Sequence, residues 1–404
     1  MKYNFDQIID RHNTGGAKWD AVEAVFGTKD VLPMWVADMD FAVAKPITEA
    51  LRKRTEHEVY GYTQPLPSVT EAVVDRMQRK YNWKIEPEWI VYTPGVVPAL
   101  FAAVRAFTKP GDGVVLQGPV YMPFWSAITS NGCCVADNEL KLKKGRYEID
   151  FKDLESKFCG DKPPKMMILC HPHNPVGRVW TEKELRRMGE IVMKNDALMV
   201  SDEIHCELLF KGYKHIPFAS ISKEFAQNSI VCMAPSKTFN LAGLSASTII
   251  IPNKKTRDCF CTARMGFTTG TNAFGLVGLE AAYRYGDEWL EQLIDYVQGN
   301  LEFLMKYFEE KIPEVKVIKP EGTYLVWLDC RKLARLPKSP GDGVQGMSTK
   351  KLRDFFIKKA KVGLEDGTIF GPEGSGFQRM NIACPRATLK EALGRIERAV
   401  RARD

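Results

Sequence analysis

The stretch KMMILCHPHNPVGRVWTEKELRRMGEIVMKNDALMVSDE, residues 165–203, decides the fold class of this chain. Two apolar runs in it, 165–170 and 197–203, have the length and composition of buried strands. Between them Thr181 and Glu184 form a predicted capping box, which marks the start of a helix. The apolar positions on one face of that helix are Leu185, Met188, Ile191 and Val192. A strand–helix–strand unit of this kind predicts neighbouring parallel strands.

The same alternation extends outward on both sides of this stretch. Further strand-like runs are GVVLQ (113–117), SIVCMAPSK (229–237) and STIII (247–251). Because such runs alternate with helical patterns, we expect an α/β fold with a large domain built on a mostly parallel sheet.

The pattern changes at residue 287. From 287 to 310 apolar residues recur every three or four positions, which predicts one long amphipathic helix of about six turns. Strand-like runs at 315–318 and 323–330 follow, then a helical segment at 348–360 and a glycine-rich loop at 371–377. This order predicts a smaller α+β domain at the C-terminal end.

These patterns divide the chain into three predicted parts. Residues 1–45 are expected to form an N-terminal arm or part of the small domain, 46–290 the large α/β domain, and 291–404 the small C-terminal α+β domain. The proline- and glycine-rich stretch 336–348 is expected to be a surface excursion.

Composition excludes several classes of protein. The 404 residues are 45% hydrophobic and 26% charged, which is typical of a globular chain. The net charge of +7 is scattered, so nucleic acid is not an expected partner. No apolar run approaches the roughly 18 residues of a membrane span, and the N-terminus lacks the pattern of a signal peptide. The ten cysteines include no C-x-x-C and are expected to be buried reduced thiols, so we expect a cytoplasmic protein.

Four polar side chains come directly after strand-like runs. In an open parallel sheet the C-terminal ends of the strands line one crevice, where functional side chains gather. The residues in these positions are Tyr121, Asn174, Asp202 and Lys237. An aromatic ring, an amide, a carboxylate and a lysine are the set that a pyridoxal phosphate site requires.

Each of these groups has a task in that chemistry. Lys237 would form a Schiff base with the cofactor aldehyde and later move protons, which requires a pKa well below its usual value of about 10.4. Asp202 would pair with the pyridine nitrogen and keep the ring protonated. Asn174 would donate to the ring oxygen O3′, and Tyr121 would stack on the ring face.

The cofactor phosphate requires backbone amides and hydroxyls. Gly95, Val96 and Val97 lead into a helical pattern with Pro98 near its first position, which predicts a helix N-terminus suited to an anion. Ser236, next to the lysine, offers a hydroxyl.

Taken singly, each residue also has an ordinary structural explanation. Lys237 could be a solvated loop residue, Asp202 a helix cap and Asn174 a turn residue before proline, and Tyr121 could belong to the core. In the N-terminal segment, Trp35 and Phe41 could shape a pocket or belong to the core, and Asp38 is expected to be structural. The set therefore carries more information than any one of its members.

Two other kinds of site are not expected. The cluster Cys170, His171, His173, His205 and Cys206 matches no standard zinc spacing. The loop GPEGSGF (371–377) lacks the strand–turn–helix context of a dinucleotide fingerprint.

Several motifs together carry a family resemblance. They are MWVADMDF, YGYT, HPHNPVGRVW, SDEIHCELLF, APSKTFNLAGL and RMNIACPR. In this order they resemble the fold type I pyridoxal phosphate enzymes of the aminotransferase class I/II superfamily. Within that superfamily they look most like the MalY/PatB-type cystathionine β-lyases, or C-S lyases.

The resemblance implies a role for each matching residue. Lys237 is implied as the Schiff-base lysine and catalytic residue. The other cofactor contacts that the resemblance implies are Val96, Val97, Tyr121, Asn174, Asp202, His205 and Ser236. Tyr62 is implied to reach the phosphate of the neighbouring subunit in a homodimer, and Arg379 to bind the substrate carboxylate through a bidentate pair.

Two positions depart from the aminotransferase pattern. Typical aminotransferases carry an arginine eight residues after the lysine, where this chain has Ser245, and a tyrosine three residues after the aspartate, where it has His205. Both differences resemble the lyase branch. His205 could equally be a packed, hydrogen-bonded histidine.

The expected activity is β-elimination of L-cystathionine or a related cysteine S-conjugate, a small-molecule amino-acid substrate, to give a thiol, pyruvate and ammonia. One alternative is a pyridoxal phosphate-dependent aminotransferase, in which the carbanion is reprotonated on the cofactor. An alternative of another class is a regulatory binding protein that retains the cofactor.

Overall fold

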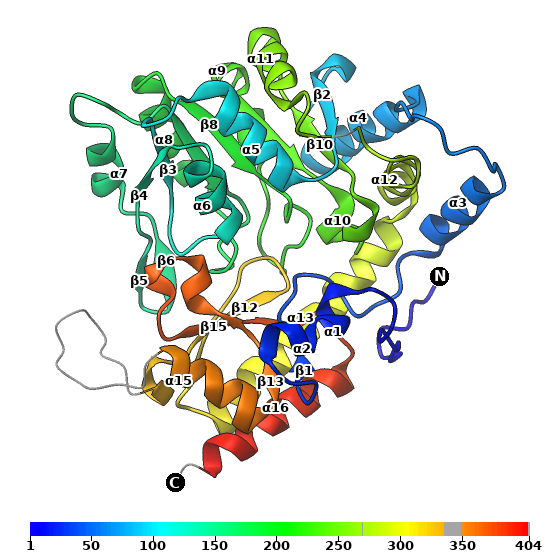
Figure 1. The fold of residues 1–404 in the computed structure, drawn as a ribbon, viewed down its shortest axis with the longest axis vertical. Coiled ribbons are helices and arrows are strands. Elements are labelled where there is room, and N and C mark those ends of the chain that lie inside the picture. The colour runs from blue at the N-terminus through cyan, green and yellow to red at the C-terminus, as the bar shows by residue number, and fades with distance from the viewer. Residues whose placement is uncertain (269, 335–348, 403–404) are drawn as a thin grey trace.

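The computed structural model describes residues 1–268, 270–334 and 349–402, and a large sheet organises the first half of the chain (Figure 1). Within the described residues this sheet has seven strands, and only β10 runs antiparallel to its neighbours. Their order is β2 (Ile90–Thr93), β10 (Ser247–Ile250), β9 (Ser229–Met233), β8 (Leu198–Asp202), β7 (Met166–Cys170), β3 (Gly113–Leu116) and β4 (Cys134–Asp137). The prediction of a mostly parallel sheet is confirmed.

Two strands of this sheet are not apparent in the sequence. The strand β2 has only four residues, and the edge strand β4 is partly exposed along its whole length. Neither shows the continuous apolar run of β7 or β9, whose residues are all buried. Short edge strands lack that signal because one side of them faces solvent or a helix end.

Helices cover both faces of the large sheet. Neighbouring strand residues alternate between the two faces: Val114 packs in one apolar cluster and Val115 in another. The helices packed on the first face are α5 (Val96–Phe107), α6 (Met122–Thr129) and α11 (Lys254–Arg264). Those on the other face include α7 (Phe151–Lys157), α8 (Glu182–Lys194), α9 (Lys223–Gln227) and α12 (Ala273–Tyr285). The predicted capping box of α8, formed by Thr181 and Glu184, is present.

The C-terminal part of the chain forms a second layer. Its antiparallel sheet has the order β11 (Lys316–Ile318), β12 (Leu325–Asp329), β15 (Phe377–Asn381) and β14 (Glu365–Asp366). The helices of this part are α14 (Arg331–Ala334), α15 (Thr349–Asp354), a π-helical turn (Phe355–Ala360) and α16 (Arg386–Arg401). The predicted small α+β arrangement is therefore present, whereas the boundaries at 45 and 290 stay predictions.

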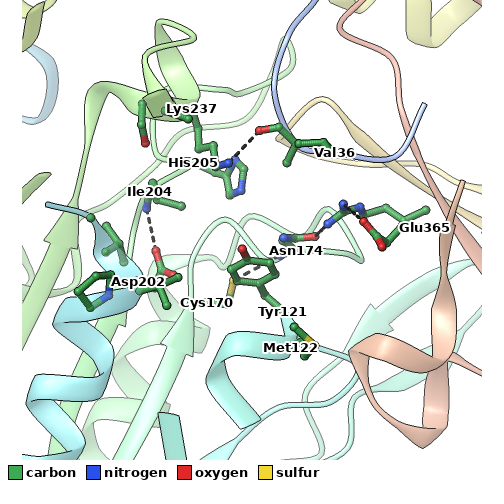
Figure 2. A pocket seen from close by; sticks show the side chains of 18 of the residues that line it. Val36, Tyr121, Met122, Cys170, Asn174, Asp202, Ile204, His205, Lys237 and Glu365 are labelled. Carbon is green, nitrogen blue, oxygen red and sulfur yellow. Dashed lines mark hydrogen bonds and ion pairs between the residues drawn. The ribbon is translucent and has the colours of Figure 1, made fainter. Parts of the chain in front are cut away.

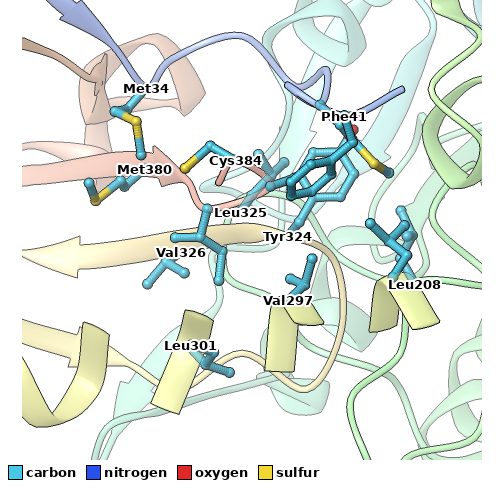
Figure 3. Packing of buried hydrophobic residues seen from close by; sticks show 14 of the residues in the cluster. Met34, Phe41, Leu208, Val297, Leu301, Tyr324, Leu325, Val326, Met380 and Cys384 are labelled. Carbon is cyan, nitrogen blue, oxygen red and sulfur yellow. The ribbon is translucent and has the colours of Figure 1, made fainter. Parts of the chain in front are cut away.

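One long helix joins the two layers. The helix α13 spans Asp287–Lys311, as its periodicity predicts. Figure 3 shows Val297 and Leu301 of α13 beneath Leu325 and Val326 of β12, with Leu208 of the large part alongside. The apolar core thus runs continuously from one layer to the other, which holds the two sheets in a defined relation.

The N-terminal segment lies between the layers. Its strand β1 (Leu32–Pro33) pairs in parallel with β13 (Val362–Gly363), and α3 (Lys45–Thr55) and α4 (Pro67–Tyr81) follow it. Two short helices, α1 (Ala17–Asp20) and α2 (Val22–Phe26), precede β1. The elements up to β1 have only two to five residues, too few to impose a helix or strand period on the sequence.

Three smaller expectations have mixed outcomes. No disulfide links the ten cysteines, and six of them are buried, but the expectation of buried thiols is wrong for the exposed Cys134, Cys159 and Cys259. The predicted excursion at 336–348 lies outside the described residues. Among the helices that the structure describes, none combines the length and apolarity that a membrane crossing requires.

Candidate active site

A cavity of about 440 Å³ opens where the parallel strands end (Figure 2). The residues singled out from the sequence that line it are Val96, Val97, Tyr121, Asn174, Asp202, His205, Ser236, Lys237 and Arg379. Tyr62 is the exception, because its side chain is fully exposed and does not line this cavity. Positions as far apart in the chain as Val96 and Arg379, which are 283 residues apart, therefore meet at one place.

The parallel strands bring these side chains together. Asp202 is the last residue of β8, and Lys237 lies in the short helix α10 (Pro235–Thr238), which begins directly after β9. Asn174 follows β7, and Tyr121 is the N-cap residue of α6 after β3. Because the C-terminal ends of parallel strands share one edge of the sheet, all four side chains face the same cavity.

Lys237 is partly buried in the wall of the cavity. Burial, together with the positive charge of Arg379, lowers the pKa of Lys237 to about 8. Its Nζ donates a hydrogen bond of 2.8 Å to the backbone oxygen of Ala37, in the N-terminal segment. Roughly a tenth to a fifth of the amine is therefore neutral near physiological pH, far more than for an ordinary lysine, and the neutral form is the one that acts as nucleophile and proton acceptor.

Burial shifts the pKa values of Asp202 and His205 in opposite directions. Burial raises the pKa of the Asp202 carboxyl to about 7, although the backbone N–H of Ile204 donates to it at 3.1 Å. Burial lowers the pKa of His205 to about 3, so its imidazole is neutral. The Nδ1 atom of His205 is buried and has no hydrogen-bond partner among the described residues. A cationic ring nitrogen next to Asp202 would return that carboxylate to its charged form.

Arg379 enters the cavity from β15 and is held at several points. Its Nη1 donates to Asn174 Oδ1 at 3.1 Å, and its Nη2 donates to the backbone oxygen of Trp35 at 2.8 Å and to Glu365 Oε2 at 3.2 Å. Its Nε is buried and without a partner among the residues described. A buried guanidinium with an unused N–H is suited to a planar anion such as a carboxylate.

The N-terminus of α5 forms another wall of the cavity. Val96 and Val97 are the first two residues of this helix, after the extended N-cap Gly95. The first N–H groups of a helix have no partner within the helix, and its dipole favours an anion there. Ser236 and Ser245 also line the cavity.

Some lining groups are not apparent from the sequence. Glu365 lies on β14, a strand of two residues with no readable pattern, directly opposite Arg379 in register. The carbonyl of Ala37 accepts from both Lys237 and the Tyr324 hydroxyl, the latter at 2.9 Å. A backbone acceptor has no side-chain signal, so only the folded chain shows it.

The sequence left open whether Trp35 and Phe41 line a pocket or belong to the core, and the structure gives a different answer for each. Trp35 lines the cavity, whereas Phe41 is buried in the core against Phe5. Asp38 forms an ion pair of 2.8 Å with Arg11, which agrees with a structural role.

The histidines behind the cavity form a separate buried group. His215 Nε2 lies 2.7 Å from Glu203 Oε2, and the rings of His171 and His215 stack at 4.2 Å. Burial raises the pKa of Glu203 to about 7 and lowers that of His215 to about 3. No group of three or more metal-ligating side chains occurs in the part of the chain that the structure describes.

Known proteins are similar to this chain in sequence and in fold. Residues 29–396 match the family described as aminotransferase class I and II. The chain is 45% identical to cystathionine beta-lyase PatB of Bacillus subtilis (strain 168), over 98% of this chain and 100% of that protein.

Two solved structures are also similar. Cystalysin from Treponema denticola, which contains a pyridoxal 5′-phosphate cofactor, has a TM-score of 0.94 and 39% identity, covering 100% of both chains. The pyridoxal phosphate-bound C-S lyase from Staphylococcus hominis has a TM-score of 0.90 and 34% identity, covering 99% of this chain and 98% of that one.

Fold and site together define a pyridoxal phosphate-dependent enzyme of fold type I. The chain belongs to the aminotransferase class I and II family, and its cofactor is pyridoxal 5′-phosphate. The residues present fit that cofactor, because a partly buried amine with a lowered pKa, a buried carboxylate and an unpartnered imidazole nitrogen surround a cavity with a helix N-terminus in its wall.

Proposed function

We propose that this chain is a carbon–sulfur lyase that cleaves L-cystathionine or related cysteine S-conjugates by β-elimination, releasing a thiol, pyruvate and ammonia. Similarity to the B. subtilis cystathionine β-lyase and to the S. hominis C-S lyase supports this activity. The observation that carries it is the partly buried amine of Lys237, with its pKa lowered to about 8, in one cavity with Asp202 and Arg379.

The cofactor supplies an electron sink for the negative charge that develops when a bond to the substrate Cα breaks. We assign its ring to Asp202, which would pair with the pyridine nitrogen, to Asn174, which would donate to O3′, and to Tyr121, which would stack on the ring face. His205 would lie near the ring as a neutral imidazole.

The phosphate would bind at the start of α5. Val96 and Val97 would donate their backbone N–H groups, and Ser236 would donate its hydroxyl. Ser245 stands where typical aminotransferases have a cation, so this chain binds the phosphate with one positive charge fewer.

Lys237 and Arg379 would act on the substrate. Lys237, as a neutral amine, would remove the Cα proton as general base, and the Ala37 oxygen would orient the amine when it is free. Arg379 would bind the α-carboxylate, using the N–H that has no partner in the described structure. The neutral amine is therefore needed for the step that precedes loss of the thiolate.

We further propose that the enzyme is a homodimer in which Tyr62 reaches the phosphate site of the second subunit. The segment around Tyr62 exposes a run of apolar side chains: Val59, Tyr60, Tyr62 and Leu66. Such a run indicates a protein interface. Ten cysteines without a disulfide favour a reducing compartment, and we place the enzyme in the cytoplasm.

Product analysis tests the activity. Purified holoenzyme is incubated with L-cystathionine in the absence of any keto acid, and pyruvate and ammonia are measured. We expect both products in equal amounts, and we expect Lys237→Ala to lose at least the ~10²–10⁴-fold that a general base contributes.

Two outcomes would contradict the proposal. Strict dependence of turnover on 2-oxoglutarate would make the chain an aminotransferase. Retained cofactor without turnover of any cysteine thioether would favour a regulatory binding protein.

A further inference from the structure

The charged lining of the cavity contains one carboxylate that the proposed function does not use. Four charged side chains line the cavity among the described residues, namely Asp202, Lys237, Arg379 and Glu365. The first three are assigned to the cofactor, the proton transfer and the α-carboxylate. Glu365 is therefore the charge that remains to meet the side chain of the substrate, and the inference below rests on the proposed function.

Glu365 lies on the substrate side of the cavity. It is the register partner of Arg379 across β14 and β15. Figure 2 shows it on the side of the cavity opposite Asp202, beyond Asn174. A substrate whose α-carboxylate binds Arg379 holds its Cα next to Glu365, so the far end of a thioether side chain comes within reach of this carboxylate.

Arg379 does not fully compensate the charge of Glu365. Their contact is a single hydrogen bond of 3.2 Å, longer than the roughly 2.7–2.9 Å of a strong charge-assisted bond. Arg379 also donates to Asn174 and to Trp35. Burial raises the pKa of Glu365 despite this partner, which indicates that the carboxylate lacks a sufficient counter-charge.

Substrate binding leaves Glu365 with still less counter-charge. The incoming α-carboxylate binds the N–H of Arg379 that has no partner among the described residues, shares the charge of this guanidinium with Glu365 and brings a second negative charge close to Glu365. The neighbouring cavity residues Trp35, Met122, Ile369 and Phe370 are uncharged, and Arg353, the other cation that acts on Glu365, does not line this cavity. A cation at the far end of the substrate would offset the repulsion between the α-carboxylate and Glu365, whereas a further anion there would increase the repulsion.

We propose that Glu365 selects substrates by charge: it favours cysteine thioethers with an ammonium group beyond the sulfur and disfavours those with only a carboxylate there. The mechanism is pairing of the ammonium with Glu365 next to the occupied Arg379. Neutral thioethers of equal size fall between the two.

Three thioethers of similar length test this inference. They are S-(2-aminoethyl)-L-cysteine, S-propyl-L-cysteine and S-(2-carboxyethyl)-L-cysteine, and kcat/KM is measured for each with the holoenzyme and with Glu365→Gln. Comparing the two proteins for each substrate cancels the different leaving abilities of the thiols.

We expect Glu365→Gln to lower the preference for the aminoethyl over the propyl substrate by about tenfold or more, the effect of a close charge pair. We also expect it to improve the carboxyethyl substrate relative to the propyl one. Asp366→Asn is the matched control, because Asp366 is the next residue on β14 and does not line this cavity. It should change all three ratios far less than Glu365→Gln does, although its charge also acts on Glu365.

A binding measurement makes the test independent of turnover. L-Lysine, L-norleucine and L-2-aminoadipate carry no sulfur leaving group, and their dissociation constants are measured by calorimetry with the unaltered holoenzyme and with Glu365→Gln. The unaltered enzyme should bind lysine more tightly than norleucine and aminoadipate least tightly, and the variant should lose this order.

The possible results separate the two claims. Equal effects of Glu365→Gln on all three thioethers would mean that Glu365 only positions Arg379, which overturns charge selection and leaves the lyase activity standing. If the unaltered enzyme cleaves no thioether, the proposed function fails. The binding order with lysine, norleucine and aminoadipate then still supports or overturns charge selection at Glu365.

Discussion

Burial sets the charge of the groups at the base of the cavity. It lowers the pKa of Lys237 to about 8 and raises that of Asp202 to about 7. Both shifts favour the neutral forms, as expected for ionisable groups removed from water. A bound cation next to Asp202 would therefore shift it fully to the carboxylate form, and this links the charge state of the site to the presence of the cofactor.

The Asp202 shift predicts how the stability of the cofactor-free protein depends on pH. Asp202 loses its proton near pH 4 when unfolded and near pH 7 when folded, so the folded state binds more protons between these values. The free energy of unfolding should therefore fall as the pH rises from about 4 to about 7, by on the order of 2–4 kcal/mol for this group. Asp202→Asn should remove that part of the decrease.

Urea unfolding of both cofactor-free proteins at about pH 4 and about pH 8 checks this prediction. Glu203, whose pKa burial also raises to about 7, is present in both proteins, so their difference isolates Asp202. A difference in unfolding free energy that is the same at both pH values would contradict it.

If Arg379 binds the α-carboxylate, replacing it by lysine should weaken substrate binding through the changed shape of the side chain, although the charge stays the same. Arg379→Lys keeps the positive charge but removes the planar arrangement of N–H groups that a carboxylate binds in pairs. We expect KM for L-cystathionine to rise about 10- to 100-fold, with a smaller change in kcat. Steady-state kinetics measures both, and an unchanged KM would show that the α-carboxylate binds elsewhere.

At the scale of the element, strand ends and helix starts do the positioning. Asp202 ends β8, and Val96 begins α5. Lys237 comes four residues after the end of β9. Each element is held by its own hydrogen bonds and apolar packing, so the groups at its end are fixed before any ligand binds.

The start of α5 allows a test of backbone binding to the phosphate. Val96→Pro removes the N–H of the first helical residue, a position where proline is otherwise well accepted. Because Val96→Ala keeps that N–H, it is the control for lost packing. We expect the proline variant to bind pyridoxal phosphate about 10- to 100-fold more weakly than the alanine variant, the effect of one charge-assisted hydrogen bond.

Equilibrium titration of both cofactor-free proteins with pyridoxal phosphate gives the two dissociation constants. Circular dichroism shows whether α5 remains folded. Equal affinities of the two folded variants would exclude the Val96 N–H as a phosphate ligand.

At the scale of the whole molecule, the question is whether the active site of one chain is complete or needs Tyr62 from a second subunit. Tyr62 is fully exposed and lies outside the cavity of its own chain. If it serves the second subunit, Tyr62→Ala and Lys237→Ala damage different halves of each site. In a mixed dimer, the site with an intact Lys237 also receives an intact Tyr62 from its partner.

Subunit mixing tests this arrangement. Each variant alone should have low activity, and unfolding and refolding them together should restore a substantial share of the normal rate. Sedimentation should show a dimer for both variants. A dimer without recovered activity would contradict the role of Tyr62, and a monomer would contradict the homodimer.

Local patterns predicted most of the elements. The runs that became β3, β7, β8, β9 and β10 are apolar along their length, and the capping box of α8 and the periodicity of α13 are readable directly. They are readable because burial on one face or on two imposes a period on the sequence. The partly exposed strand β4 and the two-residue strand β14 were not predicted, since neither imposes such a period.

The sequence by itself determined the fold class, because strands and helices impose a period on residue type, and it predicted nine lining residues from Val96 to Arg379, partly from their places after strands and partly through motifs that resemble a known family. Only the tertiary structure decided that the Ala37 carbonyl faces Lys237 and that Glu365 lies beside Arg379. The physical reason is that the first is a backbone group, identical in every residue, and the second is a pairing between two short strands. Neither exists until distant segments pack together.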